Sequence, residues 1–249
     1  MWHDNPFLTR LRLKRDSAVV APLIRNLLPK DEKEAGDMHH RLLWTLFADE
    51  GATPASPPVD GASRAAFLWR HMDAAGTFLV LGPRPAPASP YFEIETKPFD
   101  VDFCEGQRLA FDLRLNATVD RMVESGKGRA GRHRSDIVLD ALHALRREGM
   151  NEKGSGPLRL SAAQAAVSAW LARRGSQGGK GGFHLEECTV TAYRTVTVGG
   201  GRKASQQGIS DAVGVLSVTD PAVFRTMLLS GLGRRKAFGC GLMLVRPAV

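Results

Sequence analysis

The chain has 249 residues and carries 34 lysines and arginines against 26 aspartates and glutamates, a formal net charge of +8. This balance favours an anionic partner, either nucleic acid or an acidic membrane surface. No apolar run approaches the roughly 20 residues that span a bilayer, and the N-terminus lacks the charged and apolar regions of a signal peptide, so we expect a cytoplasmic protein with no membrane partner.

The first part of the chain predicts a mixture of strands and helical segments. Residues 7–13 alternate between two faces, which predicts a half-buried strand whose outer face carries Arg10 and Arg12. The turn at 73–76 separates two apolar segments and predicts a β-hairpin. The expected elements are a strand at 7–13, helical segments at 19–28 and 37–47, a loop at 51–62, hairpin strands at 66–72 and 77–81, and an extended stretch at 91–103.

The pattern begins again near residue 108. The expected elements are a strand at 108–115, a basic segment at 126–134, helices at 135–147 and 161–173, a glycine-rich loop at 175–182, one long strand or two at 183–198, a basic loop at 199–207, a strand at 212–218, a helix at 221–230 and a strand at 238–245. Each half is compatible with a β-α-β-β-α-β unit. The first half lacks a convincing second helix between Leu81 and Phe103, and the second half has an extra helix.

A loop near the end of the sequence combines glycines with consecutive cations. Four glycines within residues 231–241 surround Arg234, Arg235 and Lys236. Glycine lets backbone N–H groups approach a ligand closely, and the cations attract phosphate. Walker and dinucleotide-binding loops run from a strand into a helix, whereas here the helix comes first. The loop therefore predicts contact with a nucleic-acid backbone rather than with ATP or NAD; a tight structural turn is the alternative.

Two histidines lie in the first turn of the helix expected at 37–47. At about 100° per residue, His39 projects near the centre of the apolar stripe and His40 lies at its edge, beside Trp44. A helix N-terminus biases an imidazole toward its neutral form, which suits a general base. His40 is therefore the more available candidate, and a structural or merely exposed histidine is the alternative.

Metal-ligand spacing is absent from the sequence. Cys104, Cys188 and Cys240 are far apart and lack C-x-x-C spacing, and neither an H-E-x-x-H motif nor a G-x-S-x-G elbow occurs. If the chain is an enzyme, we expect acid/base chemistry without a metal or another cofactor. RNA suits such chemistry because its 2′-OH is an internal nucleophile, so a base, an acid and a few cations suffice.

Three motifs bear on the choice of function. Residues 8–13 have the form L-x-R-L-x-L, residues 40–47 have the form H-x-x-L-W-x-L-F, and residues 231–242 have the form G-I/L-G-x-x-K-x-x-G-C-G-L. Together they resemble the CasE-type endoribonucleases, which process CRISPR precursor RNA in type I-E systems and remain in the Cascade surveillance complex. The last motif is the most specific, because its glycine spacing, its lysine and Cys240 all match. The strand at 108–116 also resembles the start of the second domain in that family.

This resemblance implies an α+β protein of two tandem ferredoxin-like, RRM-related domains. We place them at residues 1–100, with the catalytic histidine, and at 101–249, with the basic element and the glycine-rich loop. The implied activity is metal-independent cleavage of CRISPR repeat RNA at the 3′ base of its stem-loop, which leaves a 5′-hydroxyl and a 2′,3′-cyclic phosphate. The mature crRNA is then retained in Cascade with the other subunits.

The resemblance also assigns roles to particular residues. His40 matches the catalytic histidine, which deprotonates the 2′-OH or protonates the leaving 5′-oxygen, and the helix dipole favours the role of base. Some relatives carry a tyrosine three residues earlier, where this chain has Asp37, a residue better suited to an N-cap. Lys203 lies in a loop where relatives also carry basic residues, and we expect it to stabilise the phosphorane; an ordinary phosphate contact is the alternative.

The family places a basic element of the second domain in the groove of the RNA hairpin. A-form RNA hides its base edges in a deep, narrow groove, so such an element mostly reads shape and phosphate. The residues expected to contact RNA are Arg10, Arg12, Lys127, Arg129, Arg132, Arg134, Arg202, Arg234, Arg235 and Lys236.

Two other functions are compatible with the sequence. One is a non-catalytic tandem RRM-like RNA-binding or scaffold protein, although residues 183–190 lack the aromatic-rich pattern of ordinary RRMs. The other is a metal-independent RNase that acts on a different structured RNA. Incubation with stem-loop repeat RNA in EDTA distinguishes cleavage from binding alone.

Overall fold

The computed structural model describes residues 2–14, 39–47, 66–73, 76–124, 130–147, 156–176, 180–198 and 205–248, and the fold is given for these ranges alone. The chain divides into two compact units. The first contains Met1–Asp102 and Leu228–Leu242, and the second contains Phe103–Met227 and Met243–Val249. The glycine-rich loop therefore belongs to the first unit, although it follows most of the second unit in sequence.

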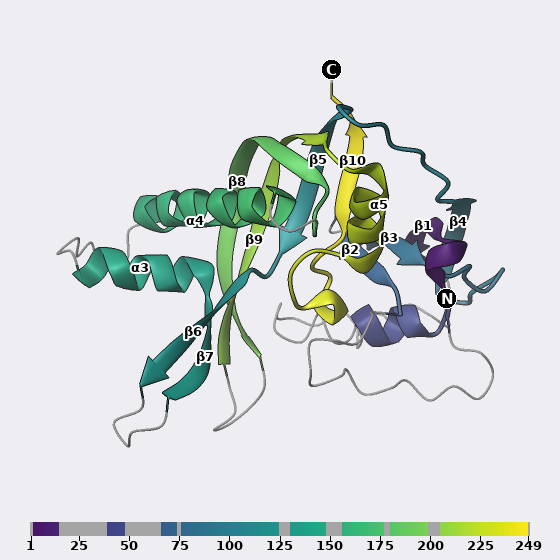
Figure 1. The fold of residues 1–249 in the computed structure, drawn as a ribbon. Helices are drawn as coiled ribbons and strands as arrows, with labels where there is room; N and C mark the ends of the chain where they lie inside the picture. The colour runs from purple at the N-terminus through teal and green to yellow at the C-terminus, as the bar shows by residue number, and fades with distance from the viewer. Residues whose placement is uncertain are drawn as a thin grey trace. The chain divides into compact units, whose positions relative to one another are not determined.

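The first unit contains a four-stranded antiparallel sheet of order β2-β3-β1-β4 (Figure 1). Its strands are β1 (Phe7–Leu13), β2 (Leu68–His71), β3 (Thr77–Gly82) and β4 (Phe92–Pro98), and a short 3-10 helix, η1 (Trp2–Asp4), precedes them. This is the order of a ferredoxin-like sheet. The hairpin predicted around residues 73–76 is confirmed: β2 pairs with β3, and Thr77 N donates a 3.0 Å hydrogen bond to Asp73 Oδ1.

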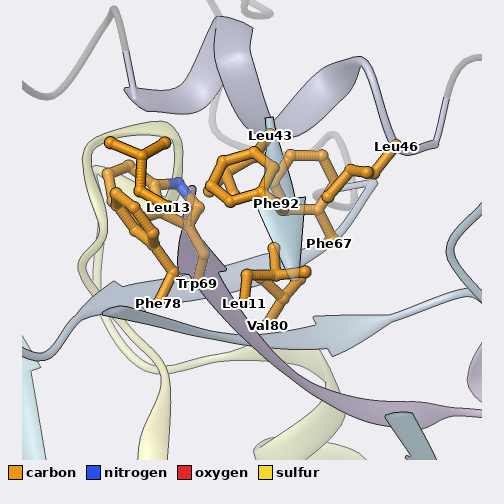
Figure 2. Packing of buried hydrophobic residues seen from close by; sticks show 9 residues of the cluster. All are labelled: Leu11, Leu13, Leu43, Leu46, Phe67, Trp69, Phe78, Val80 and Phe92. Carbon is orange, nitrogen blue, oxygen red and sulfur yellow. The ribbon is translucent and has the colours of Figure 1, made fainter. Parts of the chain in front are cut away.

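The core of this unit lies between one face of the sheet and the helical residues 39–44. The alternation predicted for β1 is confirmed, since Thr9, Leu11 and Leu13 are buried while Arg10 and Arg12 are exposed. Figure 2 shows the apolar cluster, in which residues of the sheet side meet Leu43 of the helical segment and Leu46 of the turn after it. Its members are Leu11, Leu13, Leu43, Leu46, Phe67, Trp69, Phe78, Val80 and Phe92. The cluster fixes the helical segment, and with it both histidines, over the sheet.

The connection between β3 and β4 is non-helical throughout residues 83–91, all of which the structure describes. This agrees with the missing second helix in the sequence pattern of the first half. The helix expected at 19–28 and the loop expected at 51–62 lie outside the described residues, as does Asp37.

The second unit repeats the same sheet order, as β10-β5-β9-β8. The strands are β5 (Arg108–Leu115), β8 (Phe183–Val198), β9 (Ser205–Val218) and β10 (Met243–Pro247). The inward-facing residues predicted for β5 are all buried: Leu109, Phe111, Leu113 and Leu115. The expectation of an α+β protein with two ferredoxin-like sheets is therefore confirmed.

Three helices accompany this sheet: α3 (Ile137–Arg147), α4 (Gly156–Ser176) and α5 (Pro221–Ser230). Helix α4 packs on β8 (Figure 1). Its Gln164 ties the two together, because Nε2 donates to the Cys188 carbonyl at 2.7 Å and Oε1 accepts from Val190 N at 2.8 Å. Both bonds satisfy backbone groups next to irregularities in the β8–β9 pairing.

Several boundaries differ from those expected, three of them in ribbons or turns. Residues 130–134 of the expected basic segment belong to β7 (Ala130–Asp136), which pairs with β6 (Thr118–Glu124) in a two-stranded ribbon. Strand β9 begins at Ser205 rather than at 212, and its first residues pair with β8 beyond the end of β5. The last strand begins at Met243 rather than at 238, because Lys236–Phe238 forms a short 3-10 helix, η3. Such ribbons and turns bury little apolar surface, so hydrophobic periodicity does not reveal them.

Candidate functional site

His40 lies on the exposed edge of the helical segment in the first unit. Its ring centroid lies 5.4 Å from that of Phe67 and 6.1 Å from that of Trp44, and the residue is half-buried. The two aromatic rings therefore flank the imidazole on the core side and restrict its orientation. The position beside Trp44, predicted from helical periodicity, is confirmed.

His39, in contrast, points into the core. Only 8% of the residue is exposed, and its ring contacts those of Trp69, His71 and Phe78. Burial, with a smaller contribution from the charge of His71, lowers the pKa of His39 to about 4. Within the described part of the chain, Nε2 of this residue has no hydrogen-bond partner. His39 is therefore a neutral packing residue at neutral pH.

The glycine-rich loop of residues 231–241 lies against strand β2. A Cβ built on Gly231 would lie 2.8 Å from Leu68 Cδ2, and one built on Gly239 would lie 3.1 Å from Trp69 Cζ3. Both glycines have positive φ angles, 72° and 75°. Glycine is favoured at these two positions because a side chain would be strained at these φ angles; a Cβ would also overlap Leu68 at Gly231 and press tightly on Trp69 at Gly239. The loop is closed by a 2.9 Å hydrogen bond from Leu232 N to Gly241 O.

The three cations of this loop are half-buried rather than fully exposed. The Arg235 guanidinium lies 5.1 Å from the centroid of the Phe238 ring, and Lys236 Nζ donates a 3.0 Å hydrogen bond to Gly233 O. Burial lowers the pKa of Arg235 and of Lys236, and the neighbouring charge of Arg234 lowers both further. The loop thus concentrates positive charge, but part of its hydrogen-bonding capacity is used to hold the loop itself.

The other cations predicted in this unit lie on the outer face of β1. Arg10 forms an ion pair with Glu95 of β4, and its Nε donates to the same carboxylate at 3.1 Å. Arg12 stands opposite Glu93 in the β1–β4 register. Arg10 therefore has an acidic partner and an acidic residue stands opposite Arg12, a feature that the sequence of β1 alone does not reveal.

In the second unit, β7 carries two of the predicted RNA-binding residues, Arg132 and Arg134. Arg134 forms an ion pair with Asp120 across the ribbon, with Nε 2.7 Å from Oδ1. The remaining predicted residues of this unit lie outside the described ranges: Lys127, Arg129, Arg202 and Lys203.

Asp136 holds the base of the β6–β7 ribbon, and sequence reasoning missed it. Its Oδ1 accepts hydrogen bonds from Val138 N at 2.9 Å and Leu139 N at 3.0 Å, which caps α3, and from the Tyr193 hydroxyl of β8 at 3.1 Å. Burial raises the pKa of Asp136, and burial together with this carboxylate raises the pKa of Tyr193. An aspartate directly before an apolar helical pattern is the signal that could have indicated the cap.

Chemically, His40 is an imidazole that can exchange a proton at the rim of an aromatic cluster. Among the described residues, no group of three His, Cys, Asp or Glu side chains is arranged to hold a metal ion. Within the same residues, no helix is long and apolar enough to cross a membrane.

The two ferredoxin-like sheets make this an α+β protein. A sequence model described as "CRISPR associated protein" matches residues 7–247, so the chain belongs to this family. A comparison with curated proteins gives no match by sequence.

Solved structures with the same fold cover almost the whole chain. They include the CRISPR endoribonuclease Cse3 bound to a 19-nucleotide RNA (TM-score 0.59, 23% identity, 97% of this chain and 100% of that chain) and Cas6e from Escherichia coli str. K-12 (0.59, 19%, 97% and 100%). A chain of a CRISPR RNA-guided surveillance complex is also similar (0.56, 17%, 97% and 100%). At these identities the likeness establishes the fold.

Proposed function

We propose that this protein is an endoribonuclease that binds the stem-loop of CRISPR repeat RNA and cleaves it at the 3′ base of the stem. Membership of the CRISPR-associated family over residues 7–247 carries this proposal. It is supported by the fold shared with Cse3, a CRISPR endoribonuclease with bound RNA, and by the net charge of +8. The fold shared with a chain of an RNA-guided surveillance complex supports retention of the product in a Cascade assembly with other subunits.

In this proposal His40 is the general base. It removes the proton of the 2′-OH, and the oxygen attacks the adjacent phosphorus. The bond to the 5′-oxygen breaks and that oxygen takes a proton from solvent water, leaving a 2′,3′-cyclic phosphate and a 5′-hydroxyl. The half-buried position supports this role, because one edge of the imidazole packs on Phe67 and Trp44 while part of the residue remains accessible. A neutral imidazole is the required form, and the position that the sequence predicts for His40, in the first turn of its helix, favours it.

Cations supply the remaining chemistry. The phosphorane carries additional negative charge, which fixed positive groups stabilise more strongly than they stabilise the ground state. We assign this role to Lys203, and we assign backbone contacts to Arg10, Arg12, Lys127, Arg129, Arg132, Arg134, Arg202, Arg234, Arg235 and Lys236. The reaction as written needs no metal ion.

The proposal is tested by incubating the protein with end-labelled stem-loop repeat RNA in excess EDTA. Wild type should cut once. Phosphatase should change the gel mobility of the upstream product only after acid has opened its cyclic phosphate. RNA with a single 2′-deoxynucleotide at the cut should bind and remain intact. His40→Ala should lose cleavage by at least about a hundredfold while binding persists.

The matched control is His143→Ala, because His143 is an exposed histidine on α3 in the second unit. It should cleave at the wild-type rate. If wild type binds the RNA but never cuts it, the nuclease proposal is wrong and a non-catalytic RNA-binding role remains. If His40→Ala cuts normally, the assignment of the base is wrong.

A further inference from the structure

One indole, that of Trp69, contacts both the histidine-bearing helical segment and the glycine-rich loop. Its ring meets that of His39 edge to face, with centroids 6.0 Å apart. On the loop side, a Cβ added to Gly239 would lie 3.1 Å from Cζ3 and 3.2 Å from Cη2 of the same ring. The loop backbone therefore lies directly against the six-membered part of the indole.

Trp69 itself has little freedom to move. It is 2% exposed, it stands opposite Val80 in the β2–β3 register, and its ring packs against Phe78 at 6.0 Å. A buried side chain anchored in a sheet acts as a rigid spacer. The spacing between the loop backbone and His39 of the helical segment is consequently set by the size of one indole ring.

Apolar packing alone does not explain why Trp69 and His39 occupy these two positions. Within the described part of the chain, neither Trp69 Nε1 nor His39 Nε2 has a hydrogen-bond partner, and both atoms are buried. Burying such atoms unpaired is unfavourable, and an aliphatic or phenylalanine side chain would avoid it. Buried unpaired polar groups of this kind occur at sites where a defined geometry is kept at a cost in stability.

We propose that Trp69 is a positioning residue for His40. Since His40 directly follows His39 in the helix, a shift of the indole against His39 rotates or translates the His40 imidazole as well. Through Gly239 the same indole holds the loop that carries Arg234, Arg235 and Lys236. This inference rests on the proposed function for its consequence, because it makes the placement of the general base depend on a residue that does not touch the RNA.

The first test needs no RNA. The imidazole Cε1–H resonance of His40, assigned by its loss in His40→Ala, is followed through a pH titration by NMR. In Gly239→Ala we expect both the resonance and its titration midpoint to shift from the wild-type values. Gly106→Ala is the matched control: Gly106 has almost the same φ, 77° against 75°, and its Cβ would meet no described atom within 4 Å. It should leave the His40 signal unchanged.

A double variant distinguishes loss of the contact between Gly239 and Trp69 from a general disturbance of the fold. Phenylalanine lacks the outer ring atoms that a new Cβ would meet, so adding Gly239→Ala to Trp69→Phe should produce no further shift of the His40 signal. Trp69→Phe alone should shift it. Trp170→Phe is the control for loss of a buried indole, because Trp170 is also 2% exposed but belongs to the second unit. If Trp170→Phe moves the His40 signal as much as Trp69→Phe does, the inference is wrong.

Cleavage then measures the consequence. At saturating protein, Trp69→Phe should lower the single-turnover rate about tenfold and raise the Kd for repeat RNA by less than about threefold, since displacement of a catalytic group by less than an ångström costs more rate than binding. An unaltered rate in a variant with a shifted His40 signal would overturn the positioning role. A wild-type protein that does not cleave would instead contradict the proposed function, while the NMR comparison would still decide whether Trp69 positions His40.

Discussion

At the scale of single residues, His39 makes folding sensitive to pH below neutrality. Its pKa is lowered from 6.5 to about 4 by burial and by the charge of His71, so the unfolded chain binds a proton in a range where the folded protein does not. The contribution of neutral His39 to the free energy of unfolding is therefore fully present above pH 6.5. It falls as the pH drops toward 4, by at most about 3 kcal/mol. Urea unfolding at several pH values measures this loss.

His39→Leu should remove most of that pH dependence, because leucine has no proton to bind and no buried nitrogen to leave unpaired. His143→Gln, which removes an exposed histidine of α3, should retain it. Equal pH profiles for wild type and His39→Leu would show that His39 is not held neutral in the folded protein.

A second residue-scale prediction concerns Lys203. If its charge stabilises the phosphorane, Lys203→Ala should lower the single-turnover cleavage rate by about a hundredfold and change the Kd for RNA by less than about threefold. Arg173→Ala, which removes an exposed cation at the end of α4, serves as the control and should change neither value. A parallel loss of rate and affinity in Lys203→Ala would indicate an ordinary phosphate contact instead.

The two histidines show what a sequence can supply at this scale. Helical periodicity separates His39 from His40 correctly, because burial follows from angle around a helix. It does not reveal the partners of the cations. The Arg10–Glu95 pair joins residues that are 85 positions apart, and the bond from Lys236 to Gly233 depends on backbone conformation in a short loop. Such contacts depend on tertiary placement, which no local pattern encodes.

At the scale of elements, Asp136 joins the β6–β7 ribbon to α3 and β8. Asp136→Ala removes a helix cap and the partner of the Tyr193 hydroxyl, so it should destabilise the protein by about 2 kcal/mol. It should also weaken RNA binding, because the ribbon loses the anchor at its base. Urea unfolding and a filter-binding assay measure the two effects.

The control for this prediction is Asp220→Ala, because Asp220 caps α5 through a 3.0 Å bond from Val223 N and lies far from the ribbon in sequence. It should reduce stability by a similar amount and leave the affinity for RNA unchanged. Tyr193→Phe should cost about half as much stability as Asp136→Ala. If both aspartate variants bind RNA as wild type does, Asp136 has only a structural role.

Elements with a strong hydrophobic pattern were predictable, and ribbons were not. Strand β5 and helix α5 agree with their predicted ranges because each buries one apolar face. The β6–β7 ribbon and the first residues of β9 consist mostly of polar and basic residues, and they are held by backbone pairing. Period-two alternation of apolar residues is absent there, so the sequence pattern resembles a loop.

At the scale of the whole molecule, the charge balance determines how RNA binding responds to salt. Each phosphate neutralised by a cation releases counterions, so log Kd should rise with log salt with a slope of about 0.7 to 0.9 for each contact. Lys127→Ala removes one predicted contact and should lower that slope by about one while weakening binding to repeat and unrelated hairpins alike. Arg173→Ala should leave the slope at its wild-type value. A Lys127→Ala variant that loses affinity without a change of slope would act through base recognition or structure rather than through phosphate contact.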